Sequence, residues 1–398
     1  MLTLLTLLVS FPAILFFTSL LLGWVVKPLS VGDTKGIKKC AVLIPAHNEE
    51  LLIGETVRHV LGEVSDNCVL IVVADNCTDA TAEKAKNNGA VVLQRFNNEQ
   101  KGKGFALDFG VDYILKNLEV ETVVIFDADC RFAKGAFNKL VHKSQSNELV
   151  VQAQYLMKSP KASPINLKIA ELTWALKNDI RARGMRALGL GCHLQGSGMA
   201  FPIVTLKKQS LASSSIVEDL ELGLTLALEN SAALYFEPAK VYSFFPENKS
   251  GAESQRKRWE HGHMSIIKKA PSLLLLSLKS RNIVALFMVI DAAIPPTILW
   301  LLTLASLSFI FVSLFLFVHF TVLLLVPFMF ALTLALIAGI WFTYGKEITS
   351  QIKLFDVAEF VASKFSVYRS FFSKPETAWI RTERDQEESK SRKGTKRE

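Results

Sequence analysis

The sequence predicts an α/β domain with a mostly parallel, Rossmann-like sheet, joined to α-helical transmembrane segments. Two observations lead to this prediction. Between residues 40 and 126, short apolar runs rich in β-branched residues alternate with segments of helical composition, which is typical of parallel sheets with right-handed crossovers. In addition, residues 1–26 carry no formal charge and residues 283–345 carry only Asp291. A bilayer crossing needs about 20 apolar residues, so both stretches are long enough to span a membrane.

The first apolar stretch is expected to remain as a membrane anchor, because it lacks the leading basic residues and clear cleavage site of a signal peptide. The second stretch is expected to cross twice, at 294–317 and 321–344. Four lysines follow the first stretch closely: Lys27, Lys35, Lys38 and Lys39. The positive-inside rule then predicts that residues 27–282 are cytoplasmic. The basic tail around Lys390 indicates the same side. We therefore expect a multi-pass protein of the inner or plasma membrane.

The expected domain organisation follows from these stretches. It comprises an N-terminal transmembrane helix (1–26), a cytoplasmic α/β domain (27–263), an interfacial amphipathic segment (264–293), two transmembrane helices (294–344) and a cytoplasmic amphipathic, charged tail (345–398).

The net charge indicates which partners to expect, and the cysteine content indicates the redox state of the thiols. The net charge of +8 suits a protein that lies against anionic membrane lipids. No motif combining aromatic and basic residues indicates nucleic acid, so none is expected as a partner. The five cysteines are odd in number and form no CxxC, which predicts reduced, structural thiols in a cytoplasmic domain.

The strongest local signal is the run Val123–Phe126, which ends in Asp127 and Asp129. In open α/β sheets, ligands collect at the carboxyl ends of the strands. Two acids so close together repel each other unless a divalent cation such as Mg2+ lies between them. The alternative is an ordinary polar turn after a strand.

Other predicted strands end in polar residues too. Residues 40–46 end in Pro45 and Ala46, after which His47–Glu50 is expected to open a helix, and the strand 69–74 runs into Asp75. Lys103 lies in a glycine-rich turn before a further helix. Acids, amides and a lysine suit a nucleotide diphosphate with a metal, although neither GxGxxG nor a P-loop is present.

Three later motifs complete the pattern. Gly196-Ser197-Gly198 offers little steric bulk to an approaching substrate, or is a flexible turn. Glu218 and Asp219 begin a predicted helix, where acids also favour the helix dipole. Gln255, Arg258 and Trp259 precede the second apolar stretch, where a basic anchor with an interfacial tryptophan is the alternative. A helix at about 164–184 brings Arg181, Arg183 and Arg186 close together, and this cluster suits either a lipid phosphate or a solvated face.

In this order, the segments Pro-Ala-His-Asn-Glu-Glu, Asp-Asn-Cys-Thr-Asp, Asp-Ala-Asp, Glu-Asp and Gln-Arg-Lys-Arg-Trp resemble a membrane-integrated family 2 glycosyltransferase. The branch it resembles contains the cellulose, hyaluronan and poly-N-acetylglucosamine synthases, and the resemblance spans about residues 40–265. It implies the GT-A fold, with DxD and QxxRW motifs.

The resemblance also implies residue roles. Pro45, Ala46 and Glu49 match the segment that cradles uridine, Asp75 matches the acid that reads uracil, and Lys103 matches a lysine near the nucleotide. Asp127 and Asp129 match the acids that hold Mg2+ or Mn2+ on the diphosphate, with Asp127 close to the ribose. Glu218 and Asp219 match the catalytic acid pair, with Asp219 as base, and Gln255, Arg258 and Trp259 match the motif at the diphosphate and acceptor.

The expected activity is therefore inverting transfer from a nucleotide-sugar, by resemblance a UDP-sugar, that forms a β-glycosidic bond in exopolysaccharide or cell-surface glycan synthesis. One alternative is a single addition to a lipid-linked acceptor, such as a polyprenyl-diphosphate oligosaccharide or a glycolipid. Another is a non-catalytic nucleotide-sugar-binding membrane module. With about three crossings, the chain is expected to form a homo-oligomer or to pass a glycan to export or assembly proteins. The sugar, the linkage and the acceptor are not encoded in these motifs.

Overall fold

A computed structural model describes residues 2–31, 34, 36–160, 163–246, 248–349 and 353–373. Lys35 and the charged tail after residue 373 lie outside these residues. The described chain divides into two compact units. A sheet unit holds residues 28–160 and 192–262, and a helical unit holds residues 2–27, 163–191 and 263–373. Residues 163–191 thus group with the apolar helices, although they fall within the sequence-predicted range 27–263.

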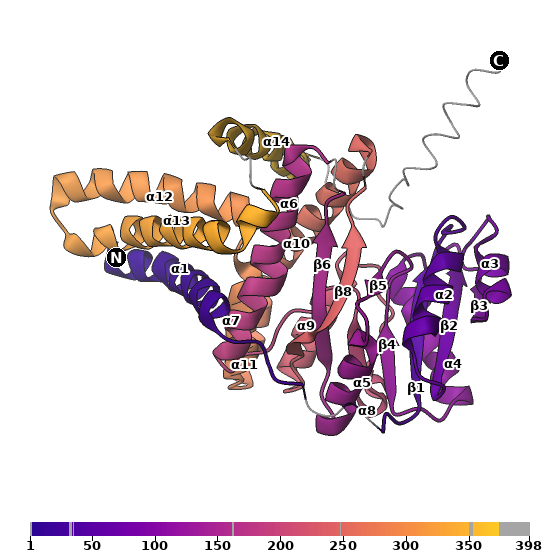
Figure 1. Ribbon diagram of the computed structural model, residues 1–398. Coiled ribbons are helices and arrows are strands. Elements are labelled where there is room, and N and C mark those ends of the chain that lie inside the picture. Colours follow the sequence, from indigo (N-terminus) through magenta and orange to yellow (C-terminus); the bar gives the residue numbers. More distant parts are fainter. Residues whose placement is uncertain are drawn as a thin grey trace, which may run out of the picture. The chain divides into compact units, whose positions relative to one another are not determined.

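The sheet unit is built on one eight-stranded sheet in the order β3-β2-β1-β4-β7-β6-β8-β5 (Figure 1). The strands β1, β2, β3 and β4 are mutually parallel, and β6 is parallel to β8. The contacts of β4 with β7, β7 with β6, and β5 with β8 are antiparallel. The mostly parallel sheet confirms the predicted fold class. Its strands are β1 (Cys40–Ala46), β2 (Cys68–Asp75), β3 (Val91–Arg95), β4 (Thr122–Ile125), β5 (Arg131–Phe132), β6 (Val151–Lys158), β7 (Met199–Pro202) and β8 (Leu234–Phe244).

Helices connect the strands of this unit. The parallel strands β1 to β4 are joined by α2 (Ile53–Glu63), α3 (Thr81–Asn87) and α4 (Lys103–Asn117), and the later strands by α5 (Ala136–Asn147), α8 (Ile203–Leu206) and α9 (Glu218–Leu228). From β1 to β3 the chain moves toward one sheet edge, and from β3 to β4 it moves back past β1. Because such crossovers are right-handed, α2 and α3 cover one face and α4 the other. All of β4 is buried, as a strand covered on both faces requires.

The segment His47–Glu50 does not open a helix as its sequence predicts, because α2 begins later, at Ile53. Asn48 has a φ of 56°, and its side-chain oxygen accepts a hydrogen bond from the Thr78 amide at 2.8 Å. The His47 ring nitrogen Nδ1 lies 2.7 Å from the Asp75 carbonyl oxygen. These contacts with the end of β2 hold the segment in a turn, so tertiary bonding overrides its helical composition.

The helical unit contains three helices that are long and apolar enough to cross a membrane, at Leu2–Val25, Thr297–Val318 and Thr321–Thr343. The first two are α1 and α12, and the third combines a short 3-10 turn with α13 (Leu325–Thr343). A shorter apolar helix, α11 (Ile283–Ala293), precedes α12. These candidate spans coincide with the sequence-predicted apolar stretches to within a few residues, and their length and composition indicate a membrane protein.

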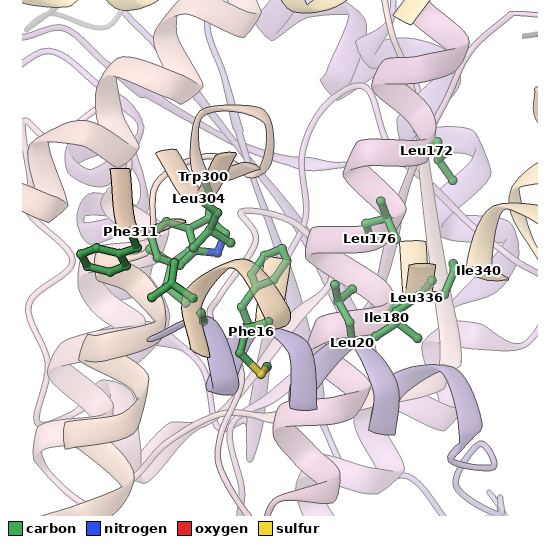
Figure 2. Packing of buried hydrophobic residues seen from close by; sticks show 14 of the residues in the cluster. Phe16, Leu20, Leu172, Leu176, Ile180, Trp300, Leu304, Phe311, Leu336 and Ile340 are labelled. Atoms are coloured by element: carbon green, nitrogen blue, oxygen red, sulfur yellow. The ribbon is translucent and has the colours of Figure 1, made fainter. Parts of the chain in front are cut away.

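The core of the helical unit joins these helices to a continuous helix of three parts, α6 (Ile165–Ala175), the π-helical turn η1 (Leu176–Ile180) and α7 (Arg181–Ala187). Figure 2 shows Phe16 and Leu20 of α1, Leu176 and Ile180 of this helix, and Leu336 and Ile340 of α13 in one buried cluster. The unit also contains α14 (Leu354–Ser373) and the second half of α10 (Lys249–Lys279), which crosses the boundary between the units.

Two arginines of the helical unit are ion-paired with aspartates of the same unit. Arg181 is buried and bonded to the buried Asp291, the formal charge of the second apolar stretch. Arg183 Nε lies 3.0 Å from the fully buried Asp179 carboxylate. Buried charges in proteins are generally paired in this way. The described contacts therefore account for these two arginines without a lipid phosphate.

Candidate active site

The carboxyl ends of three parallel strands deliver the first group of predicted site residues. β1 ends with Pro45 and Ala46, whose register partners on β2 are Val73 and Ala74, so Asp75 follows directly at the same edge. β4 pairs with β1 on the other side and leads into Asp127. The sequence-predicted nucleotide and metal residues therefore lie along one edge of the sheet, where open α/β sheets bind ligands.

Asp75 is held by a buried cation that sequence reasoning did not identify. Arg95, the last residue of β3, donates to Asp75 Oδ1 at 2.7 Å. It also donates to the backbone oxygen of Gln100 at 2.9 Å, in the loop that leads to Lys103. Asp75 Oδ1 accepts a further hydrogen bond from the Asn76 amide group at 3.1 Å. The protein thus fixes Oδ1 of the Asp75 carboxylate, and it orients in advance the acid that is predicted to contact the nucleotide base.

Lys103, the first residue of α4, is the centre of the site. Its Nζ lies 2.6 Å from Asp127 Oδ1 and 3.7 Å from Glu218 Oε1, and it donates to the Gly196 carbonyl oxygen at 2.8 Å. Residues from the β4 end, the start of α9 and the Gly196 loop therefore meet at one ammonium group. These residues are between 24 and 115 positions from Lys103 in the sequence, and the structure brings them into direct contact with its ammonium group.

The loop at Gly196 borders Asp219 as well. A Cβ built at Gly196 would lie 3.3 Å from Asp219 Oδ2 and 3.4 Å from Lys103 Nζ, and the residue has a φ of 89°. Asp219 Oδ1 accepts a hydrogen bond from the Leu220 amide at 2.8 Å. The candidate base and the lysine thus both lie close to the position that a side chain at Gly196 would occupy, so only glycine fits there without moving them.

The same loop is bonded to the segment that carries the predicted metal ligands and to the sheet. Ser197 is fully buried, and its hydroxyl accepts a hydrogen bond from the Asp127 amide at 3.0 Å. The buried side chain of Gln152 accepts from the Gln195 amide at 2.9 Å and donates to the Ser197 carbonyl at 3.0 Å. Gln152 therefore fixes the peptides on both sides of Gly196.

Burial sets the electrostatics of this cluster. It raises the pKa of Asp127, because the attraction of Lys103 offsets only part of the loss of hydration. It also raises the pKa of Glu218, against the opposing attraction of Lys103 and of Arg258. Burial by itself would lower the pKa of Lys103, but the carboxylates of Asp127 and Glu218 outweigh it and raise that pKa. Lys103 therefore stays charged at every physiological pH.

Carboxylates outnumber cations in this cluster. The acids are Asp127, Asp129, Glu218 and Asp219, and the cations are Lys103 and Arg258. When all are ionised, the excess negative charge equals the charge of one divalent cation. The donor set fits such an ion, because the ligand atoms of Asp127, Asp129 and Cys130 lie within 4.8 Å of one another.

Oxygen ligands dominate this set. Burial raises the pKa of the Cys130 thiol well above its ordinary value, and the neighbouring Asp129 and Asp127 add to the effect. A thiol is also a soft ligand, whereas the two carboxylates supply hard oxygens. Hard carboxylate oxygens favour Mg2+ and Mn2+ over softer metals.

The remaining predicted residues lie on the first half of α10, within the sheet unit. Arg258 acts electrostatically on Glu218, which places it near the start of α9. The Trp259 indole meets the Phe245 ring edge-on, with 6.5 Å between ring centroids. Gln255 is buried, and its Oε1 has no hydrogen-bond partner among the described residues. A buried, unpaired acceptor is costly, so this oxygen is available to a ligand.

Two family models match this chain. The model described as glycosyl transferase family 2 matches residues 41–201, and the model described as glycosyl transferase family group 2 matches residues 122–342, more than half of the chain.

Curated relatives cover part of the chain. The low-salt glycan biosynthesis hexosyltransferase Agl6 of Haloferax volcanii is 30% identical over 27% of this chain and 25% of its own length. The probable glycosyltransferase YdaM of Bacillus subtilis is 25% identical over 60% of this chain and 58% of its own length. The chain thus spans between a quarter and about three fifths of these relatives. Among solved structures, the mannosyltransferase PcManGT of Pyrobaculum calidifontis is 17% identical with a TM-score of 0.47, over 86% of this chain and 100% of that chain.

Proposed function

From the premise that the chain belongs to glycosyl transferase family group 2 and is a glycosyltransferase, we propose that it is an inverting enzyme of the membrane. It transfers a sugar from a UDP-sugar to an acceptor and forms a β-glycosidic bond, in exopolysaccharide or cell-surface glycan synthesis. The observation that carries this proposal is the cluster around Lys103, where Asp127 and Glu218 lie within ion-pair distance of one ammonium group.

The donor binds along the edge of the sheet. Pro45, Ala46 and Glu49 cradle the nucleoside, and Asp75 accepts a hydrogen bond from the base with the carboxylate edge that Arg95 leaves free. Lys103 and Asp127 lie near the ribose and diphosphate. Asp127 and Asp129 would hold Mg2+ or Mn2+, which supplies positive charge for the leaving diphosphate when bound.

Transfer requires one deprotonation and one departing diphosphate. Asp219 takes the proton from the attacking hydroxyl as a positioned general base. As the bond to the diphosphate breaks, Arg258 stabilises the charge that develops on it, an effect that is usually among the largest in catalysis. The Gln255 side-chain N–H donates to an oxygen of this diphosphate, and Trp259 offers an apolar face to the acceptor sugar. One in-line attack inverts the anomeric centre without a covalent intermediate.

The small number of candidate membrane spans bears on whether the product is a polymer or a single addition. Three candidate spans favour a chain that assembles with copies of itself, or that passes its glycan to export proteins. A single addition to a lipid-linked acceptor is the second candidate function, and the same observation favours it. Product size separates the two, because a polymer gives a ladder and a single addition gives one labelled lipid.

The test compares membranes that contain wild-type protein, Asp219→Asn, or the control Glu221→Gln, which removes a carboxylate from the same first turn of α9. Each is incubated with radiolabelled UDP-sugars and Mn2+, and products are separated by lipid extraction and by gel. Asp219→Asn is expected to lower the rate by about 100-fold or more, as for loss of a general base, while Glu221→Gln retains activity. Wild-type rates in Asp219→Asn would exclude Asp219 as the base.

A further inference from the structure

We propose that Thr56 and Arg131 are positioning residues for the metal-binding acids Asp127 and Asp129. They act through the carbonyl of Ala128, the residue between these two acids. This inference deepens the proposed function and rests on it, since it assumes that Asp127 and Asp129 hold a divalent cation. Neither residue belongs to a motif of the sequence analysis. Thr56 lies in the first turn of α2, and Arg131 begins β5 directly after the acidic segment.

A chain of hydrogen bonds connects the two residues to the acids. Arg131 Nη1 donates to the Thr56 hydroxyl at 2.7 Å and to the Cys130 carbonyl at 2.8 Å. The Thr56 hydroxyl lies 2.5 Å from the carbonyl oxygen of Ala128 and 3.2 Å from that of Leu52. Because a hydroxyl has one proton, the shorter contact takes it, and Thr56 donates to Ala128.

Ala128 is the residue between the two acids, and its carbonyl belongs to the peptide that joins it to Asp129. The direction of this carbonyl therefore sets the orientation of that peptide. The Thr56 side chain is fully buried and Ala128 is 5% exposed. A buried carbonyl that loses its partner is costly, and water has little access to replace the hydroxyl. The positive charge of Arg131 strengthens its hydrogen bond to the Thr56 hydroxyl, because hydrogen bonds from ionised donors are stronger than neutral ones. Arg131 Nη2 lies 3.1 Å from the carboxylate of Glu55, which is also on α2.

The same helix holds the chain beyond the acids. The His59 ring nitrogen Nε2 accepts from the Phe132 amide at 2.9 Å, and Glu63 accepts from the Gly135 amide at 2.8 Å. One face of α2, with Thr56, His59 and Glu63 about one turn apart, therefore fastens the whole segment from Ala128 to Gly135. The acids are fixed from the other side as well, by the bond from the Asp127 amide to Ser197.

The N-terminal end of α2 is bonded to the predicted nucleoside segment. The Glu49 carbonyl accepts hydrogen bonds from the Leu52 amide at 3.0 Å and from the Ile53 amide at 2.9 Å. A single rigid helix thus carries both the turn that cradles the nucleoside and the support of the metal-binding peptide. Outer partners of this kind orient metal ligands and affect metal affinity when they are removed.

The experiment measures Mn2+ binding to full-length protein in detergent by electron paramagnetic resonance, with UDP and separately with GDP. Thr56→Val keeps the branched shape and removes the hydroxyl, and we expect the dissociation constant for Mn2+ to rise about tenfold. Thr56→Ser restores the hydroxyl and is expected to bind as wild type. In turnover assays the activation constant for Mn2+ should rise more than kcat falls, which a general loss of stability would not produce.

Thr122→Val is the matched control. Thr122 is buried on β4, and its hydroxyl has no hydrogen-bond partner among the described residues, so the same substitution should leave Mn2+ affinity unchanged. Arg131→Met removes the guanidinium and should weaken Mn2+ binding in the same direction, even if Thr56→Val does not fold. If Thr56→Val and Arg131→Met both bound Mn2+ as tightly as the wild-type protein, this inference would be overturned and the proposed function would still stand. If wild-type protein and Asp129→Asn were alike in binding no Mn2+, the metal-dependent function and the inference would both be overturned.

Discussion

Gly196 is the residue at which the candidate base and the central lysine come closest to the same backbone. Replacing it with alanine places a Cβ 3.3 Å from Asp219 Oδ2 and 3.4 Å from Lys103 Nζ, at a φ of 89°. The backbone strain alone costs about 1–3 kcal/mol, and relief of the close contacts displaces Asp219 or Lys103. We expect Gly196→Ala to lower transfer activity at least tenfold, measured by the labelled-donor assay.

Gly135→Ala separates strain from displacement. Gly135 also has a positive φ, 68°, but a Cβ there meets nothing within 4 Å. This variant should therefore lose a comparable amount of stability, measured by thermal unfolding, and keep its activity. Equal activity losses in the two variants would show that strain, and not the position of Asp219 and Lys103, accounts for the effect at Gly196.

Residues at the ends of strands and helices were predictable from the sequence. Asp75, Asp127 and Glu218 follow a visible change from an apolar run to polar residues, and ligand positions in α/β sheets follow that change. Lys103 was predictable from the glycine-rich turn that contains it. Thr56 lies inside a helix, where a threonine gives no signal of the distant carbonyl that it contacts. Arg95 ends β3 and could have been found by the same rule as Asp75. Its pairing with Asp75 follows from the strand register, which composition does not specify.

At the scale of elements, the close crossing of α1 with the π-helical turn and α7 stabilises the helical unit. A Cβ built at Gly184 would lie 1.7 Å from the Ser19 carbonyl oxygen, and one at Gly23 would lie 1.7 Å from that of Ile180. Small residues four apart on a membrane helix allow such an approach. The sequence predicted both helices, but the pairing of Gly23 with Gly184 depends on how they cross.

Gly184→Ala therefore tests this crossing. The added methyl group cannot fit without separating the two backbones, and overpacking of this kind costs about 1–3 kcal/mol. We expect a lower midpoint of thermal unfolding in detergent and faster proteolysis of the helical unit. The control is Gly62→Ala on α2, where a Cβ meets nothing within 4 Å. Helical alanine is about 0.5–1 kcal/mol more favourable than glycine, so this variant should be at least as stable as wild type. An unchanged midpoint in Gly184→Ala would mean that the two helices do not cross this closely.

At the scale of the whole molecule, the apolar pattern predicted the number and position of the candidate spans, because length and hydropathy alone define them. It did not predict that residues 163–191 belong with those spans, since this stretch contains Glu171, Asp179 and Arg181 and reads as a polar helix. Their burial depends on ion pairs such as Arg181 with Asp291, which join segments far apart in the chain. Local composition therefore misassigns a charged helix whose charges are neutralised by distant partners.

Sidedness is the remaining property of the whole chain, and it decides whether the candidate site meets the cytoplasmic pool of nucleotide-sugars. Basic residues after α1 predict a cytoplasmic sheet unit and an external turn between α12 and α13. In intact cells, a membrane-impermeant maleimide is expected to label His319→Cys, which lies in that exposed turn. Lys39→Cys, exposed ahead of β1, should react only after permeabilisation, with the wild-type protein as the background for native thiols. Labelling of Lys39→Cys in intact cells would place the site outside, where the proposed donor is absent, and would contradict the proposed function as well as the orientation.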